Sequence, residues 1–132
     1  ELESPETFLE PMKNQAFKAG CALILSHHDF NATPGDHELE EIMKACYRKG
    51  ADVAKIATRV RNRDEALRLL SLYRLEGRKV ILGMGDQGRI TRVAAPMLGG
   101  EFTFAAPGRG GETAPGQLDF EQLQTIYRLI GT

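Results

Sequence analysis

The sequence predicts an α/β fold in which strands and helices alternate and the strands pair in parallel. Four short apolar runs are expected as strands, and the segments around them have the apolar spacing of helices. The apolar runs are residues 21–26, 52–57, 79–82 and 101–105. Alternation through short connections is typical of a parallel sheet built from right-handed β/α units. With 132 residues, the chain is expected to form a single domain over residues 1–132.

The first two helices are expected from the signals at their ends. Ser4-Pro5 and Glu10-Pro11 are both plausible starts of the first helix, because proline is tolerated in a first turn. Gly20 is expected to end that helix. Thr33-Pro34 predicts the N-cap and first residue of the second helix, which should continue until Gly50.

Three further helices are expected in the second part of the chain. One should run from Asn62 to Glu76 and be closed by Gly77, and a shorter one should occupy residues 89–98. Asp119 followed by Gln122 has the spacing of a capping box, which predicts the start of the last helix.

The composition favours a protein that binds a small molecule, with no nucleic acid and no membrane as partner. The formal net charge of −1 offers no electrostatic attraction to nucleic acid or anionic lipid. No apolar run approaches the roughly 18 residues that cross a bilayer, and the acidic opening at residues 1–6 is unlike a signal peptide, so a cytoplasmic location is expected. Cys21 and Cys46 lie on apolar stretches and are expected to be buried, reduced thiols.

Polar and glycine-rich segments follow the predicted strands. They are residues 26–30 after the first strand, Lys55 near the end of the second, residues 83–88 after the third and residues 108–117 after the fourth. In parallel α/β folds, ligands bind at the carboxyl ends of the strands. These segments are therefore expected to share one site.

Lys55 lies inside Asp52 to Ala57, which otherwise has the composition of a buried strand. An ammonium ion is costly to bury, so the site must offer it an anion or lower its pKa until it is a free amine. A free amine is a nucleophile. Considered alone, this segment also permits an edge strand whose lysine reaches solvent.

Two other kinds of site are weighed for these segments. Gly83 to Gly88 has the glycine spacing of a dinucleotide-binding turn, but no acidic residue ends the next strand to bind a ribose, so a tight turn that requires positive φ is favoured. His27, His28 and Asp29 are the candidates for a metal site, with His37 as an additional candidate. Neighbouring histidines in an extended segment point to opposite sides, and no metal-ligand spacing is present, so no metal and no cofactor are expected.

Four motifs are spread over essentially the whole chain. They are Ser26-His27-His28-Asp29-Phe30 with Thr33-Pro34, Ala51-Asp52-Val53-Ala54-Lys55-Ile56-Ala57, Gly88-Arg89-Ile90-Thr91-Arg92, and Thr113-Ala114-Pro115-Gly116-Gln117. In this order and spacing they resemble the type I 3-dehydroquinate dehydratase family. The resemblance implies the second half of a (β/α)8 TIM barrel. It also implies a lyase of the shikimate pathway of aromatic amino acid biosynthesis, which converts 3-dehydroquinate to 3-dehydroshikimate through a Schiff base.

The resemblance implies roles for particular residues. Lys55 matches the family's imine-forming lysine and His28 its general acid and base. Arg92 matches the arginine that holds the substrate carboxylate. Thr113 stands where the family more often has serine, and Gln117 matches the glutamine of the loop that closes over the substrate.

His27 is a departure from the family, which often has Asn or Tyr before the catalytic histidine, and a packing role beside the site is expected for it. The likeness covers only the second half of the family's barrel. Glu1-Leu2 are expected to be the end of the fourth barrel strand. The missing first half would supply further substrate contacts and the carboxylate that orients the histidine.

A half-barrel leaves open sheet edges, so association with the missing half or with a second copy, as a dimer or other homo-oligomer, is expected. Three functions stay open. The chain is part of a dehydratase that is active once the first half is present, or a non-catalytic half-barrel that keeps the site residues. The third is a class I aldolase, which would give no reason for Arg92 or for the Thr113 to Gln117 set.

Overall fold

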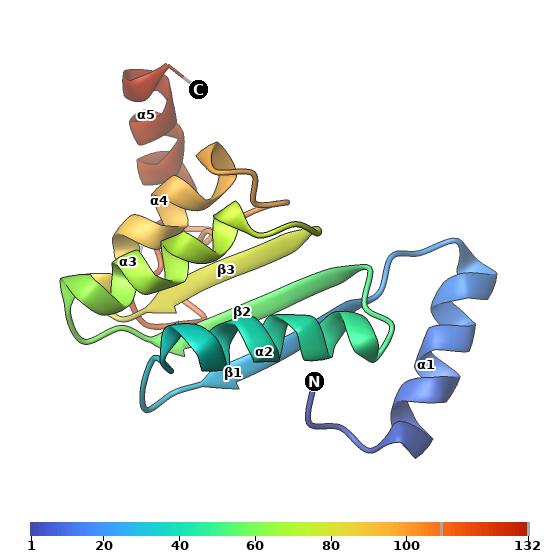
Figure 1. The fold of residues 1–132 in the computed structure, drawn as a ribbon. Coiled ribbons are helices and arrows are strands. Elements are labelled where there is room, and N and C mark those ends of the chain that lie inside the picture. The colour runs from blue at the N-terminus through green and yellow to red at the C-terminus, as the bar shows by residue number, and fades with distance from the viewer. Residues whose placement is uncertain (109, 132) are drawn as a thin grey trace.

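The computed structural model describes residues 1–108 and 110–131. Its sheet contains three parallel strands in the order β1-β2-β3, which are Ile24–Asp29, Val53–Arg59 and Lys79–Met84. The helices are α1 Glu6–Ala19, α2 Asp36–Arg48, α3 Arg63–Ser71 with the short η1 Leu72–Arg74, η2 Asp86–Gly88 leading into α4 Arg89–Met97, and α5 Phe120–Ile130. Figure 1 shows α2 and α3 over the same face of the sheet, with α1 and α5 at opposite ends of the molecule. The predicted alternation of parallel strands and helices is confirmed.

Three helix ends follow the local signals in the sequence, whereas the helix predicted from Asn62 to Glu76 is shorter, because α3 ends at Ser71 and η1 at Arg74, ahead of Gly77. Gly20 ends α1 in the left-handed conformation, with φ of 64°. The Asn62 side chain accepts a hydrogen bond from the Glu65 N–H at the start of α3. Asp119 and Gln122 form the predicted capping box at the start of α5, because each side chain accepts a hydrogen bond from the other residue's backbone N–H.

The start of α2 differs from the prediction. The helix begins at Asp36 and its N-cap is Gly35, so Thr33 does not cap it. The Thr33 hydroxyl instead donates to the Arg59 carbonyl oxygen at 2.7 Å and lies 2.9 Å from the Thr58 hydroxyl. These contacts tie the loop after β1 to the end of β2, and they use the oxygen that a cap would need.

The prediction that Cys21 is buried in the first strand is wrong. β1 begins at Ile24, which pairs with Val53, whereas the Cys21 N–H donates to the Ala16 carbonyl at the end of α1. The Cys21 thiol is exposed, whereas Cys46 is buried and free as expected. Burial raises the pKa of the Cys46 thiol to about 11, so it stays protonated at neutral pH.

Residues 101–105 do not form the fourth strand that their composition predicts. The Glu101 N–H donates to the Lys79 carbonyl, which is the first step of a ladder along the free edge of β3. The Tyr73 hydroxyl donates to the Ile81 carbonyl and accepts from the Ile81 N–H. The Thr91 hydroxyl accepts from the Gly83 N–H. Side chains therefore occupy the edge where a fourth strand would pair.

Tyr73→Phe is expected to lower the free energy of unfolding by about 1–3 kcal/mol. The substitution leaves the buried N–H and carbonyl of Ile81 without the hydroxyl that both of them use. Tyr47→Phe is the matched control, because its hydroxyl donates to the Arg78 carbonyl at an exposed position where water can replace it. Urea unfolding of both variants measures the difference, and equal losses would contradict the assigned role of Tyr73.

The main core lies between the sheet and the helices that cover one of its faces. α2 packs on β1 and β2, and α3 and α4 pack on β3. Ile56 and Ile81 point into this core together with Leu39 of α2 and Leu69 of α3, and all four side chains are fully buried. Because side chains alternate along a strand, the neighbours of Ile56 point to the opposite face of the sheet.

No helix among residues 1–108 and 110–131 has both the length and the apolar character needed to cross a membrane.

Candidate functional site

The strand register brings His28 and Lys55 to the same face of the sheet. Ser26 pairs with Lys55 and Lys55 with Val80, while His28 pairs with Ala57 and Ala57 with Leu82. Lys55 and Ala57 are two residues apart and so share a face, which places His28 one pleat further along that face than Lys55. This is the face opposite the helix-covered core.

A cavity of about 230 Å³ opens on this face. All five residues expected to act on the substrate line it, from four different parts of the chain. The lining residues are His28, Phe30, Lys55, Ala57, Leu82, Met84, Arg92, Phe104, Thr113, Ala114 and Gln117. The structure thus brings the predicted residues together, while the role of each one stays a prediction.

Lys55 is half-buried, and its amine faces an aromatic ring. The Nζ atom lies 4.9 Å from the centre of the Phe104 ring. Burial lowers the pKa of the Lys55 amine, the Glu1 carboxylate opposes this shift, and the Arg92 guanidinium adds to it. A lower pKa increases the fraction of free amine at neutral pH, which is the reactive form.

Arg92 presents a desolvated cation to the same cavity. The residue is only 2% exposed, and burial lowers the pKa of its guanidinium, although arginine remains charged at neutral pH. Its Nε has no hydrogen-bond partner, and no carboxylate forms an ion pair with it within residues 1–108 and 110–131. A buried cation without a partner is costly, so an anionic ligand fits this position.

The two neighbouring histidines point to different partners, as expected for an extended segment. His28 Nδ1 lies 3.0 Å from Glu1 Oε2, and the His28 ring stacks on Phe30 with centroids 6.0 Å apart. His27 Nδ1 lies 2.5 Å from Glu3 Oε1. His27 pairs with Ile56 in the sheet register and so lies on the core face, away from the cavity.

Glu1 and Phe104 are not among the residues that the sequence singles out. The family resemblance assigns the carboxylate that orients the histidine to the missing first half; within this chain, the Glu1 carboxylate lies 3.0 Å from His28 Nδ1. It does so because the Leu2 N–H donates to the Ser26 carbonyl and holds the start of the chain beside β1. The expectation that Glu1-Leu2 end a barrel strand is the sequence feature that indicates a position for Glu1 near the site.

Hydrogen bonds between Thr113 and Gln117 stabilise the loop that carries both residues. Gln117 Oε1 accepts hydrogen bonds from the Thr113 N–H at 2.8 Å and from the Thr113 hydroxyl at 3.1 Å. The Gly85 N–H donates to the Pro115 carbonyl, which fixes the loop against the turn after β3. Both side chains thus reach the cavity from a loop that is anchored at its middle.

The glycines between β3 and α4 have a packing explanation. Gly85 has φ of 86°, the positive value expected for a tight turn. A Cβ on Gly88 would lie 2.5 Å from the Gly83 carbonyl carbon, so the two ends of the turn approach too closely for side chains. This geometry accounts for the spacing that resembles a dinucleotide-binding turn.

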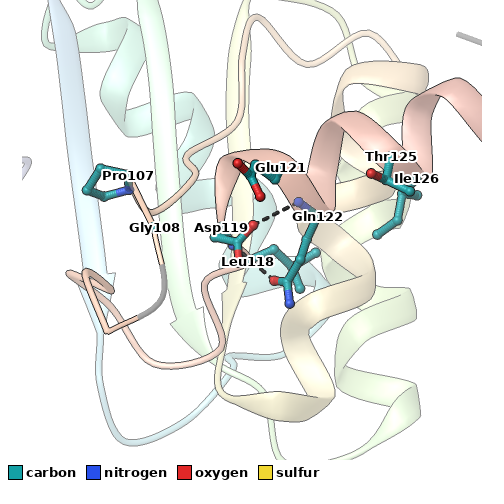
Figure 2. Close-up of a pocket in the computed structure, with 8 residues that line it drawn as sticks. All are labelled: Pro107, Gly108, Leu118, Asp119, Glu121, Gln122, Thr125 and Ile126. Atoms are coloured by element: carbon teal, nitrogen blue, oxygen red, sulfur yellow. Dashed lines mark hydrogen bonds between the residues drawn. The ribbon is translucent and has the colours of Figure 1, made fainter.

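A larger concavity of about 790 Å³ surrounds the start of α5 and is drawn in Figure 2. Two of its polar residues, Asp119 and Gln122, are already bonded to each other's backbone in the capping box. None of the five predicted site residues lines it. Among residues 1–108 and 110–131, no group of three or more His, Cys, Asp or Glu side chains is arranged to hold a metal ion.

Comparison with known proteins identifies relatives of this chain. Residues 1–132 match the type I 3-dehydroquinase family. The 3-dehydroquinate dehydratase of Methanopyrus kandleri is 35% identical over 124 residues, which are 93% of this chain and 56% of that protein. The enzyme of Methanococcus maripaludis is 37% identical over 110 residues, 83% of this chain and 50% of the relative.

Solved structures of the same enzyme share the fold. The type I 3-dehydroquinate dehydratase of Clostridium difficile superimposes with a TM-score of 0.84 and 28% identity, covering 96% of this chain and 51% of that one. The 3-dehydroquinate dehydratase of Aquifex aeolicus gives a TM-score of 0.82 with 31% identity, covering 93% of this chain and 55% of that one. The chain therefore spans about half the length of its relatives, and its parallel β/α units form half of a TIM barrel. The match along its whole length shows that the chain belongs to the type I 3-dehydroquinase family.

Proposed function

We propose that this chain supplies the reacting half of a 3-dehydroquinate dehydratase, a lyase that works through a Schiff base on Lys55. One observation carries the proposal: the cavity holds an amine and a guanidinium whose pKa values burial lowers, together with an imidazole paired to a carboxylate. A nucleophile, an anion-binding group and a proton-transfer group are the set that this elimination needs.

The proposed reaction begins with the Lys55 amine and the C3 ketone of the substrate. Their condensation releases water and forms a protonated imine, which withdraws electrons and acidifies the C2 proton. His28 accepts that proton, and the C1 hydroxyl leaves as water after receiving a proton from the same imidazole. Hydrolysis of the imine then consumes one water and returns the free amine. The balance is the loss of one water from 3-dehydroquinate.

The remaining residues are proposed to bind rather than react. The planar guanidinium of Arg92 matches the carboxylate on C1 and fixes which face of the ring meets His28. Thr113 and Gln117 deliver hydrogen bonds from the loop over the cavity. The hydroxyl of Thr113 preserves the donor that the family's more common serine would offer.

A related structure supports covalent chemistry at this kind of site. The Clostridium difficile enzyme is described with covalently modified comenic acid. A ligand held by a covalent bond fits a family whose site contains a nucleophile. The neighbour's description supports the class of chemistry, and the assignment to Lys55 rests on the cavity described above.

The proposed partner is the other half of the barrel, and the alternative partner is a second copy of this chain. The proposed location of the assembled protein is the cytoplasm. At the outer edge of β1, the Leu2 N–H donates a hydrogen bond to the Ser26 carbonyl, and no strand pairs with this edge among residues 1–108 and 110–131. An unpaired strand edge is a template for another strand. Mass in solution distinguishes monomer from dimer, and adding the family's N-terminal half tests for gain of activity. A stable complex with all five residues intact and no turnover would favour the non-catalytic half-barrel.

Arg92→Ala in the assembled barrel is expected to raise KM with a smaller effect on kcat. Removing a buried charge-assisted partner of a carboxylate should weaken binding by about 2–4 kcal/mol, or roughly 30- to 700-fold. Gln117→Ala is the milder comparison, since a neutral hydrogen bond contributes roughly 0.5–1.5 kcal/mol. Steady-state kinetics measure both variants. An unchanged KM for Arg92→Ala would show that this arginine is structural.

A further inference from the structure

Phe104 provides the aromatic surface next to the proposed nucleophile. The centre of its ring lies 4.9 Å from Lys55 Nζ, and the ring forms part of the cavity wall. Phe102 packs edge-on against it, with centroids 5.4 Å apart and an angle of 74° between the planes. Phe102 itself does not line the cavity. Both rings lie on the segment that does not form a strand, and both remain partly exposed, Phe102 at 37% and Phe104 at 39%.

We propose that Phe104 is a positioning residue for Lys55: its ring covers one side of the amine, limits its contact with water and so favours the free, nucleophilic form. The proposal rests on the proposed function, in which Lys55 attacks a ketone. The proposal gives residues 101–105 an indirect role in the reaction, through the effect of Phe104 on the Lys55 amine.

Two effects of the ring act in opposite directions. An aromatic face attracts an ammonium ion and favours the charged form, by about 0.5–1 kcal/mol at a partly exposed site. An apolar group that displaces water disfavours the charged form. Burial is the largest cause of the lowered pKa of Lys55, and comparing apolar and polar replacements of Phe104 separates the two effects of the ring.

Within the part of the chain that the structure describes, the Lys55 amine has no direct ion pair that would stabilise its charged form. Among residues 1–108 and 110–131, no carboxylate oxygen lies within ion-pair distance of Lys55 Nζ. Glu1, the carboxylate that acts on the pKa of Lys55, is bonded to His28. Glu1 therefore opposes the lowering of the Lys55 pKa through space, without a direct ion pair to the amine.

The test is the titration of Lys55 by competitive labelling with trace acetic anhydride from pH 6 to 11, read by mass spectrometry of the Lys55 peptide. Phe104→Ala is expected to shift the titration to higher pH by about half a unit or more, because water then reaches the ammonium form. Phe104→Leu keeps an apolar cover but loses the aromatic face, so its titration should not rise above that of the parent and should fall by up to about half a unit. Phe104→Gln, which places a polar amide there, should shift in the same direction as alanine.

Phe102→Ala is the matched control, because it removes the same ring from the same segment without opening the cavity wall. A shift as large as that of Phe104→Ala would mean that the segment rearranges, and would overturn the proposal. An unchanged titration in Phe104→Ala and Phe104→Gln would overturn it too. A shift to lower pH in both Ala and Leu variants would show that the ring acts as a cation partner instead.

Labelling uses no substrate, so the two proposals fail separately. A shifted titration in a protein that never dehydrates 3-dehydroquinate would support the cover and contradict the proposed function. Circular dichroism of each variant establishes that it is folded, and the leucine and glutamine variants keep the test open if alanine destabilises the segment.

Discussion

Lys55→Ala is expected to abolish dehydration of 3-dehydroquinate by the assembled barrel while leaving the substrate bound. The amine is the group that forms the proposed imine, and no other lysine lines the cavity. In the parent protein, borohydride added with the substrate should reduce the imine and leave a stable adduct on Lys55. Peptide mapping by mass spectrometry locates the label.

Lys79 is a matched control for this experiment. It is also a buried strand lysine whose pKa burial lowers, but its amine donates to the Leu75 carbonyl oxygen at 2.5 Å and lies outside the cavity. If a lowered pKa alone made a lysine reactive, both residues would be trapped. Label on Lys79, or an active protein that carries no label at all, would remove the imine mechanism.

Three helix ends were predictable because their signals are local, whereas Thr33 failed as a cap because its hydroxyl bonds Thr58 and Arg59 of β2. Gly20, Asn62 and the pair Asp119 and Gln122 each act within about four residues of themselves, and the structure confirms all of them. The predicted strand at residues 101–105 failed for a reason that no local pattern contains. Its pairing edge on β3 is occupied by hydroxyls of Tyr73 and Thr91, which come from two other helical segments.

The same distinction applies to the site. His28 and Lys55 could be placed in one site because both lie near the carboxyl ends of parallel strands, and the register puts them on one face. The contacts of Glu1 and Phe104 with the site could not be predicted in this way, because they depend on tertiary packing. Glu1 reaches His28 through the backbone bond between Leu2 and Ser26, and Phe104 reaches Lys55 from an irregular segment.

His28→Ala is expected to slow turnover by several powers of ten, beyond the ~10²–10⁴-fold loss typical of a general acid or base. One imidazole is proposed to accept the C2 proton, to protonate the departing hydroxyl and to serve the proton transfers of imine formation and hydrolysis. An imidazole titrates near neutral pH, so it can both accept and donate there. kcat for dehydration and the rate of borohydride trapping together report the loss at each step.

His27→Ala is the control for that variant, because the two histidines are adjacent and each is paired with a glutamate. His27 bonds Glu3 on the core face of the sheet, whereas His28 bonds Glu1 and lines the cavity. Loss of His27 should therefore act through stability and leave kcat within about tenfold of the parent, since it removes no proton-transfer step. Equal losses of kcat in the two variants would mean that the catalytic histidine has been assigned to the wrong position. A large loss confined to His28→Ala, with trapping at Lys55 slowed as well, would assign imine formation and elimination to the same imidazole.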